Sequence, residues 1–206
     1  MSKQVLITPL PPNALGGYRL AGHTGLLAAT LAENSIIYAF QWTNERYQAV
    51  IHDVQFYVGV AGAVTTGVLT GVALTPVRDF WNAYTGGTQL NISGVTGHEI
   101  KLNAQHQSPL VADVRIATTG ALGLPLVPGT LDATDVGEFL FGTGTTAGVV
   151  GTVHTSDLLL PHGEDYPLIL NAYEGFVIRM SLNGPATGTL RISVATAWYE
   201  TIKSIY

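Results

Sequence analysis

The stretch Leu190-Arg-Ile-Ser-Val-Ala-Thr-Ala-Trp-Tyr-Glu200 alternates in polarity along most of its length. Side chains of a β-strand point to opposite faces in turn, so this alternation predicts a strand with one face in a core. The residues expected to point inward are Leu190, Ile192, Val194, Thr196 and Trp198, and those expected to point outward are Arg191, Ser193, Ala195, Ala197 and Tyr199. Residues 175–182 alternate in the same way, and the turn-rich residues 183–188 lie between the two segments. The pair is therefore predicted to form an antiparallel β-hairpin.

A second pair of strands is predicted over residues 35–60. Residues 35–43 place Ile36, Tyr38, Phe40 and Trp42 on one face, and residues 47–60 place Val50, His52, Val54, Phe56 and Val58 together. The turn-like Asn44-Glu-Arg46 between them predicts another hairpin. Shorter strands are expected within residues 25–31, 89–92, 98–102, 110–117, 138–141 and 168–170.

Residues 54–77 carry no charge and are long enough to cross a membrane as a helix. Their glycines and their many Val and Thr residues instead predict a strand, a glycine-rich turn and a second strand. Residues 75–84 suit either a short helix, with Thr75 as N-cap, or a strand, which the β-rich surroundings favour. No segment keeps a helical period. The chain is therefore expected to be all-β, a β-sandwich that is jelly-roll-like.

The N-terminal segment, residues 1–25, contains Pro9, Pro11, Pro12 and four glycines. Proline and glycine disfavour helices and central strands, so this segment is predicted to be an extended N-terminal arm. Residues 26–206 are then expected to form a single β-sandwich domain. Two alternatives stay open for the arm: it packs as a loop on its own domain, or it reaches a neighbouring subunit by strand addition or by draping over it.

The chain carries few charges for its length. Its 9 Lys and Arg and 14 Asp and Glu residues make 23 charges in 206 residues, whereas 47% of the residues are hydrophobic. A typical soluble domain of this length would carry roughly 52 charges, so a free monomer would expose an uncharged surface. Because the interfaces of obligate assemblies are more apolar than ordinary surfaces, we expect other protein to cover much of this one.

Composition argues against several classes of partner and compartment. The net charge is −5 and no cluster of Lys or Arg occurs, so no basic face for nucleic acid is expected. The chain contains no cysteine, which excludes disulfides, thiolate zinc sites and a cysteine nucleophile. The apolar run at the N-terminus ends at Pro9, so it is not expected to act as a signal peptide, and the chain is expected to be made and used without Sec export.

The sequence offers no motif that predicts catalysis. Neither the Gly-x-Ser-x-Gly elbow nor a Lys-containing phosphate loop occurs. Residues 142–147 match a loose dinucleotide pattern, but the residues that follow do not favour the helix that this pattern requires. Two groups close in sequence, His98, Glu99 and His106 and then His154, Asp157 and His162, lack spacings typical of zinc sites. No catalytic residue, metal or cofactor is therefore predicted.

Three arginines, Arg115, Arg179 and Arg191, lie in the middle of predicted strands that carry few other charges. A mid-strand arginine is expected to have a carboxylate partner, either inside the domain or across an interface. Glu174 and Glu200 are the candidate partners, and these five residues are the predicted structural or interface ion pairs. The alternative is that the arginines face solvent on an outer strand face.

Several segments in the second half of the chain are similar to one protein family. They are Gly86-Gly-Thr88, Asp113-Val-Arg-Ile-Ala-Thr-Thr119, Gly129-Thr-Leu-Asp132, Leu168-Ile-Leu-Asn-Ala-Tyr-Glu-Gly-Phe-Val-Ile-Arg179, Ala186-Thr-Gly-Thr189 and Trp198-Tyr-Glu200. Over residues 85–206 they resemble virion structural proteins of tailed bacteriophages. The resemblance implies a β-rich, head-associated protein without enzymatic activity. Tyr173 stands where other members tend to have Asn, which predicts a difference in a local turn.

These observations predict a structural protein of the bacteriophage virion, a capsid cement or decoration protein that binds and stabilises the lattice of the major capsid protein. It is expected on the capsid surface after assembly in the host cytoplasm, as a homo-oligomer (dimer or trimer), with neither nucleic acid nor membrane as partner. One alternative is a neck or tail structural protein of the virion. Another is a carbohydrate- or receptor-binding module that uses exposed aromatic side chains, and an enzyme comes third.

Overall fold

The computed structural model describes residues 14–60, 62, 64, 67–78, 84–90, 99–103, 112–123, 130–142, 154–157 and 167–202, without the side chains of residues 14, 99–103 and 154–157. The described residues form strands, turns and loops, and no helix occurs among them. The longer strands are β1 (Ala14–His23), β3 (Ile36–Trp42), β4 (Tyr47–Val60), β5 (Leu69–Arg78), β8 (Ala112–Ile116), β10 (Gly137–Gly142), β13 (Gly175–Met180) and β14 (Thr189–Ile202). The shorter strands are β2 (Leu27–Ala28), β6 (Thr88–Gln89), β7 (Glu99–Asn103), β9 (Thr130–Leu131), β11 (His154–Asp157) and β12 (Leu168–Leu170).

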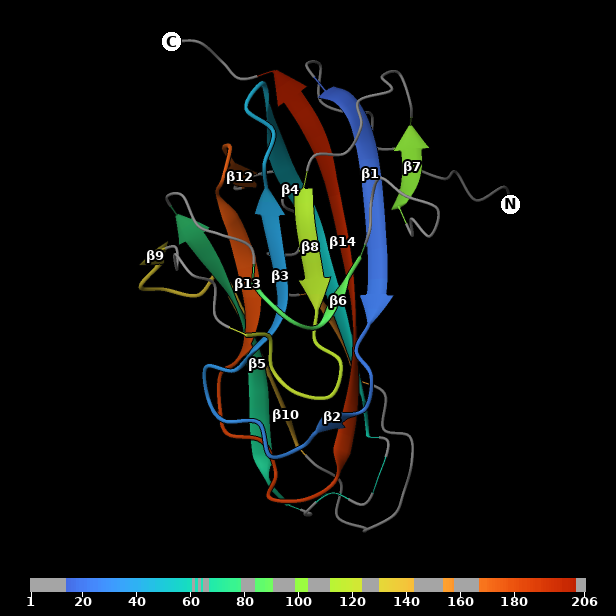
Figure 1. The fold of residues 1–206 in the computed structure, drawn as a ribbon, viewed down its shortest axis with the longest axis vertical. Helices are drawn as coiled ribbons and strands as arrows, with labels where there is room; N and C mark the ends of the chain where they lie inside the picture. The colour runs from blue at the N-terminus through green and yellow to red at the C-terminus, as the bar shows by residue number, and fades with distance from the viewer. Residues whose placement is uncertain are drawn as a thin grey trace, which may run out of the picture.

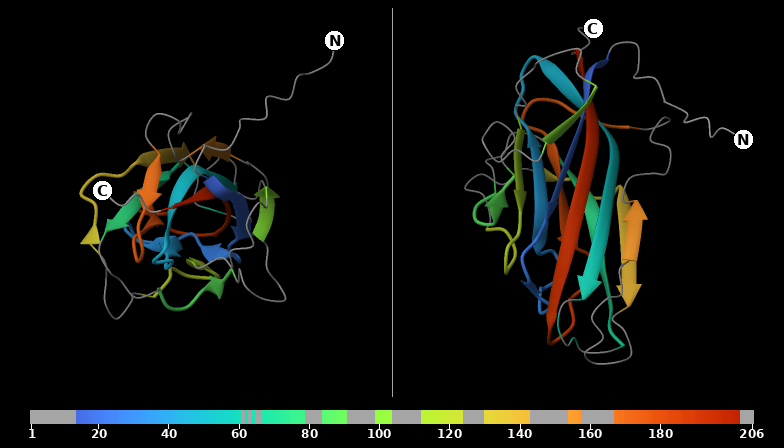
Figure 2. Two further views of the ribbon diagram at one scale, coloured as in Figure 1. Left: turned by 90° about the horizontal axis from the view of Figure 1, so that it is seen from above. Right: turned by 90° about the vertical axis from the view of Figure 1, so that its right-hand side faces the viewer.

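The strands form two antiparallel sheets that pack against each other (Figure 1, Figure 2). Sheet A has the order β11-β4-β14-β1-β7, with β12 beside β4 and β2 beside β14. Sheet B has the order β10-β5-β13-β3-β8-β6, with β9 beside β5. The prediction of an all-β sandwich is confirmed, and the jelly-roll topology stays a prediction.

Aromatic side chains from both sheets meet in the centre of the sandwich. Tyr18 of β1 stacks on Trp198 of β14 with ring centroids 5.6 Å apart, and Trp198 packs edge-on against Phe40 of β3 at 5.4 Å. Phe40 in turn stacks on Phe176 of β13 at 5.3 Å. Each such pair contributes roughly 0.5–1.5 kcal/mol beyond the burial of its area. This chain of rings fastens sheet A to sheet B.

The alternation of β14 has the predicted consequence. All five residues predicted to point inward are buried, and of the outward ones only Ala195 is buried. The uncharged residues 54–77 include the end of β4 and most of β5, as the strand prediction requires. β5 includes the first part of the strand predicted at residues 75–84, as far as Arg78, and residues 79–83 lie outside the described residues. No described residue lies in a helix that is long and apolar enough to cross a membrane.

Both predicted hairpins are wrong, because their strands lie in different sheets. β3 pairs with β13 and β8 in sheet B, whereas β4 belongs to sheet A, and β13 and β14 are separated in the same way. Alternation predicts which side chains are buried but does not choose the strand that supplies the hydrogen-bonding partner. A short connection can also cross to a facing sheet about 10 Å away. The indole Nε1 of Trp42, which donates to the carbonyl oxygen of Tyr47 at 2.8 Å, bridges the first of these crossings.

The prediction that Val50 and His52 share a face with the later residues of β4 is also wrong. Ala197 and Trp198 of β14 pair with Asp53 and Ile51, so β4 carries one extra residue at this point, a β-bulge. A bulge interrupts the alternation of a strand. Ile51 is therefore buried, whereas His52 is exposed. β12 and β11 pair with β4 on the two sides of this bulge.

Residues 14–23 do not belong to the extended arm predicted for residues 1–25. They form β1, which lies inside sheet A between β14 and β7. Glycine suits this strand because neighbours fill the space of a side chain: a Cβ at Gly22 would lie 2.6 Å from Cδ1 of Leu90. Tyr18 and Leu20 bring an apolar face to the core. The sandwich therefore begins before residue 26, and residues 1–13 lie outside the described residues.

Candidate functional site

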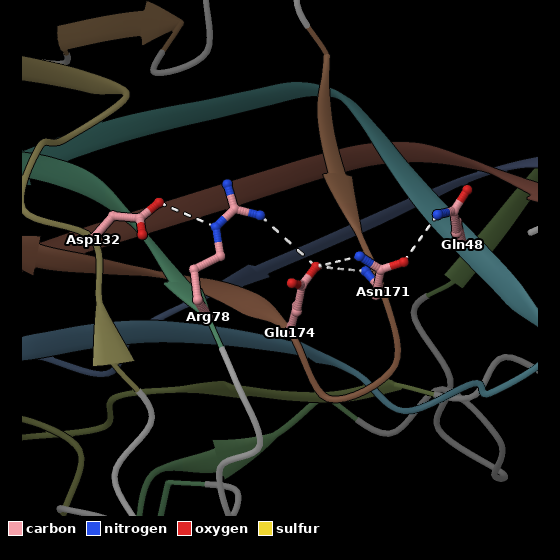
Figure 3. A network of polar contacts seen from close by, with 5 residues as sticks. All are labelled: Gln48, Arg78, Asp132, Asn171 and Glu174. Carbon is pink, nitrogen blue, oxygen red and sulfur yellow. Dashed lines mark hydrogen bonds and ion pairs between the residues drawn. The ribbon is translucent and has the colours of Figure 1, made fainter. Parts of the chain in front are cut away.

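A network of polar side chains joins β4, β5 and the turn between β12 and β13 (Figure 3). Its centre is the carboxylate of Glu174. Glu174 Oε2 accepts hydrogen bonds from the backbone nitrogen of Asn171 at 2.8 Å and from Asn171 Nδ2 at 3.0 Å. Hydrogen bonds to a charged acceptor are stronger than neutral ones, so this carboxylate holds the turn in one conformation.

Arg78, at the end of β5, connects this turn to the segment after β9. Its Nη1 lies 3.8 Å from Glu174 Oε2, and its Nε donates to Asp132 Oδ2 at 3.2 Å. On the other side Gln48 Nε2 of β4 donates to Asn171 Oδ1 at 2.9 Å, so the network spans both sheets. The Arg78 and Asp132 side chains are 41% and 33% exposed, and water limits such a pair to at most about 1 kcal/mol.

Tyr173, in the same turn, has a φ of 67°, in the left-handed region of the backbone. Asn adopts this conformation more readily than Tyr does. The Tyr173 hydroxyl donates to Glu45 Oε1 at 2.9 Å, in the loop between β3 and β4. This hydrogen bond, and then the negative charge of Glu45, raise the pKa of Tyr173. The contact ties the strained turn to the neighbouring loop.

A second network surrounds Arg179 on the outer face of sheet B. Arg179 Nη2 lies 2.8 and 3.1 Å from the two carboxylate oxygens of Asp135, and Arg179 Nε donates to Thr75 Oγ1 at 2.9 Å. Thr75 Oγ1 itself donates to Asp135 Oδ1, and Arg179 Nη1 donates to Asn34 Oδ1. The Arg179 and Asp135 side chains are only 19% and 24% exposed. The network therefore attaches the segment before β10 to β5 and β13.

The carboxylate partners of the predicted arginines differ from those expected. Arg115 Nε pairs with Asp113 Oδ1 at 3.0 Å along β8, and Arg179 pairs with Asp135, so neither uses Glu174 or Glu200. Asp113 is two positions from Arg115 on the same face of β8, so the alternation of this strand could have indicated it. Asp135 comes from a turn-rich segment far from Arg179 in the chain, and sequence distance hid it.

The other two predicted residues lie on opposite faces of β14. Arg191 is exposed, with no ion pair or side-chain hydrogen bond to another described residue. Glu200 is fully buried and points inward. They are nine positions apart along the strand, roughly 30 Å, so they cannot pair within one chain.

These two polar networks hold loops in fixed positions on the sheets. Both networks attach loops to the sheets through arginines whose partners are carboxylates and amides. Among the described residues no three His, Asp or Glu side chains come together to hold a metal. The side chains of the two groups noted in the sequence (His98, Glu99 and His106, and His154, Asp157 and His162) lie outside the part of the chain that the structure describes.

The sequence predicted only part of the outer face of sheet A. We call it the open face, and it consists of the outward residues of β1 (Gly17, Arg19, Ala21, His23), β14 (Ser193, Ala195, Ala197, Tyr199) and β4 (Val50, Asp53, Gln55, Tyr57). The alternation of β14 predicted its central row. The row from β1 was missed because glycine and proline suggested an arm. β14 and β4 face the viewer in the right panel of Figure 2.

The open face differs from the outer face of sheet B, which the chain itself covers. Ala39 and Val177 point outward from sheet B, yet they are 2% and 0% exposed. On the open face Arg19, Ala21, His23 and Tyr57 are exposed, whereas Gly17, Val50 and Ala195 are buried. The tryptophans Trp42 and Trp198 lie in the core and are unavailable for stacking on a sugar.

In comparisons with known proteins, no family model and no curated sequence matches the chain.

Proposed function

We propose that this chain is a structural protein of a bacteriophage virion, a cement or decoration protein that binds and stabilises the lattice of the major capsid protein. The observation that carries the proposal is the scarcity of charge on a folded surface. The accessible surface of 11,010 Å² is shared by 23 charged residues, one for about 480 Å². Surfaces of this kind are typical of proteins whose faces are covered in an assembly.

The described ion pairs reduce the available charge further. Side chains already paired within the domain are those of Arg78, Arg115, Arg179, Asp113, Asp132, Asp135 and Glu174. Glu200 is buried. Large apolar side chains are meanwhile exposed at Leu69 and Leu140, which lie diagonally across β5 and β10 at one corner of sheet B. This apolar corner is a candidate contact with the capsid lattice.

The order of strands supports the jelly-roll topology, which we propose for the sandwich. In sheet A the order β1-β14-β4-β11 alternates early and late strands of the chain, and in sheet B the order β3-β13-β5-β10 does the same. Jelly rolls occur in viral capsid proteins and in lectins. Because one fold serves many functions, this topology supports the proposal without deciding it. The resemblance of residues 85–206 to virion proteins of tailed phages favours the capsid.

The decisive measurement is the number of copies in particles. Quantitative mass spectrometry of virions from the phage that encodes this chain should find hundreds of copies, scaling with the major capsid protein. A count of about a dozen or fewer would replace the capsid role by a neck or tail role. Absence from purified particles would contradict any role in the virion, and a specific glycan bound on an array would then favour the carbohydrate-binding alternative.

A further inference from the structure

The strand β10 ends sheet B, and among the described residues only one of its two edges has a neighbour. That neighbour is β5, which pairs with β10 from Gly137 to Gly142 without a bulge. Native proteins protect open edges with charged side chains, proline, bulges or a covering segment. β10 contains no proline and one charged residue, Glu138. Glu138, Leu140 and Gly142 are exposed, and a Cβ added at Gly142 would meet no atom within 4 Å. This edge therefore has room for another strand.

The hydrogen bonds of β5 show which backbone groups of β10 point to this edge. The nitrogen of Ser181, just after β13, donates to the carbonyl oxygen of Gly71 at 3.0 Å, so the backbone groups of Gly71 point to the β13 side of β5. Leu140 lies opposite Gly71 and forms no hydrogen-bonded pair with it. The backbone groups of Leu140 therefore point away from β5, as do those of Glu138 and Gly142, two positions away on either side. No described residue forms a hydrogen bond with these outward groups.

We propose that β10 pairs with β10 of a second copy of this chain, antiparallel and about a two-fold axis at Leu140. Leu140 then lies opposite Leu140 of the second copy, and Glu138 of each copy lies opposite Gly142 of the other. These three hydrogen-bonded pairs supply about six hydrogen bonds, two from each pair, and join both copies of sheet B into one sheet. Such a contact occupies the open edge of both copies, so the association closes at a dimer.

The sequence of β10 favours this register over its alternatives. An axis at Glu138 would set two carboxylates opposite each other, and like charges in that position destabilise a sheet. An axis at Gly142 would leave only Gly142 paired within β10. With the axis at Leu140, the two glutamates stand four positions apart along the strands, roughly 13 Å. The Leu140 side chain, 46% exposed in the single chain, then packs against its counterpart.

The inference goes beyond the proposed function, because this pairing needs no capsid. Leu69, 57% exposed on β5, lies opposite Gly142, so β10 stands between it and the second copy. Leu69 stays on the outer face of the joined sheet. The apolar corner proposed as a contact with the capsid lattice would then belong to a dimer, with one Leu69 on each side of the two-fold axis.

Substitutions at Gly142 test the register through charge. Gly142→Lys puts a positive charge opposite Glu138 of the second copy, twice in each dimer, whereas Gly142→Glu puts a negative charge there. Sedimentation equilibrium of the full chain should show a monomer–dimer equilibrium. Its Kd should be at least about tenfold higher for the Glu variant than for the Lys variant.

Gly120, in the loop after β8, provides the matched control. It is exposed, and a Cβ added there would also meet no atom within 4 Å. Gly120→Lys and Gly120→Glu change the net charge as the Gly142 variants do, but away from the edge of β10. The Kd values of these two variants should agree within about threefold, since distant exposed charges are screened by salt.

Leu140→Pro tests the pairing of the backbone. Proline is tolerated on an edge strand where the replaced N–H points away from the sheet. The variant should therefore keep a cooperative thermal melt, while its dimer Kd rises about tenfold or more because the central donor is lost.

Cysteine cross-linking tests the position of the axis. The chain contains no cysteine, so each variant carries a single thiol. Leu140→Cys places the two thiols on directly opposite residues, whose Cα atoms are about 5.5 Å apart. A short bis-maleimide should then yield a covalent dimer at concentrations where the chain is dimeric. Leu69→Cys is the matched control, because its two Cα atoms would be roughly 20 Å apart, three strand spacings and four residue positions.

Any of four results would overturn the inference. They are a full chain that stays monomeric at every soluble concentration, equal Kd values for the two Gly142 variants, a folded Leu140→Pro variant with unchanged Kd, and equal cross-linking at positions 140 and 69. The outcome is separable from that of the proposed function. A dimer that passes these tests without any copies in virions would contradict only the capsid role, and a monomeric chain abundant in virions would contradict only the pairing.

Discussion

Gly184 lies at the contact between two loops, and this contact is possible only because glycine has no side chain. Its backbone nitrogen donates to the carbonyl oxygen of Leu31 at 2.8 Å, and a Cβ added at this position would collide with the carbonyl oxygen of Ala29. We expect Gly184→Ala to lower the free energy of unfolding by about 2–3 kcal/mol, because backbone atoms must move.

Gly120 provides the matched control for this substitution. A Cβ at Gly120 would meet no atom within 4 Å, and its φ is not in the left-handed region. Gly120→Ala should therefore be neutral or stabilise the fold by up to about 1 kcal/mol. Urea denaturation measures both changes. Equal effects of the two substitutions would contradict the close contact between Gly184 and Ala29.

Tyr173 and Asn34 both have a φ of 67°, but only Asn suits that conformation. Tyr173→Asn should raise the free energy of unfolding by up to about 1 kcal/mol through relief of strain, less the lost hydrogen bond to Glu45. Tyr173→Phe removes the hydrogen bond to Glu45 and keeps the strain, so it should lower the free energy of unfolding slightly. A thermal melt that ranks Asn below Phe would show that the turn is not strained.

At the scale of elements, β1 is required by the core. Tyr18 and Leu20 are each 1% exposed, and burying two such side chains contributes roughly 5 kcal/mol, a large part of the stability of a domain. A chain that lacks residues 1–24 should therefore fail to unfold cooperatively, as measured by circular dichroism and limited proteolysis. If it keeps the stability of the full chain, β1 is a dispensable arm.

The strands themselves could be predicted from alternation, but their partners could not. The prediction of which side chains of residues 190–198 are buried was correct at nearly every position, because one side of β14 is apolar. β3 is buried on both faces, so its sequence does not say which strand lies beside it. The bulge at His52 depends on the register with β14, and Gly22 in β1 is explained by the neighbouring Leu90.

The candidate site was less predictable than the fold for the same reason. Arg179 was identified as a residue that needs a partner, and its charge in an apolar strand was a sufficient signal. Its partner Asp135 comes from a turn-rich segment that the fold brings over the outer face of sheet B. Nothing near Arg179 in the sequence indicates that approach.

At the scale of the whole molecule, the outer faces of the two sheets differ in how they are covered. The chain covers sheet B with its own loops and fixes them through Arg78 and Arg179. On the outer face of sheet A, Arg19, Ala21 and His23 of β1 are exposed, whereas Val50 and Ala195 are buried.

Buried phenols make the whole sandwich sensitive to alkali. Burial raises the pKa of Tyr38 above its ordinary value of about 10, against the opposing effect of its 3.0 Å hydrogen bond with Thr196, and burial also raises the pKa of Tyr84 and Tyr199. A raised pKa in the folded state stabilises the fold fully below pH 10, and that stability is lost as the pH rises, because the unfolded chain ionises first. The free energy of unfolding should therefore fall steeply above pH 10.

Tyr38→Phe separates this effect from general alkaline denaturation. At pH 7 the variant should be about 1 kcal/mol less stable, since it loses the hydrogen bond to Thr196 between the sheets. Above pH 10 its stability should fall less steeply than that of the original chain, by about 1.4 kcal/mol for each pH unit, because one buried phenol no longer titrates. Urea unfolding at a series of pH values from 7 to 11.5 measures both terms. Parallel curves for the two chains would mean that the phenol of Tyr38 already ionises in the folded state as it does in water.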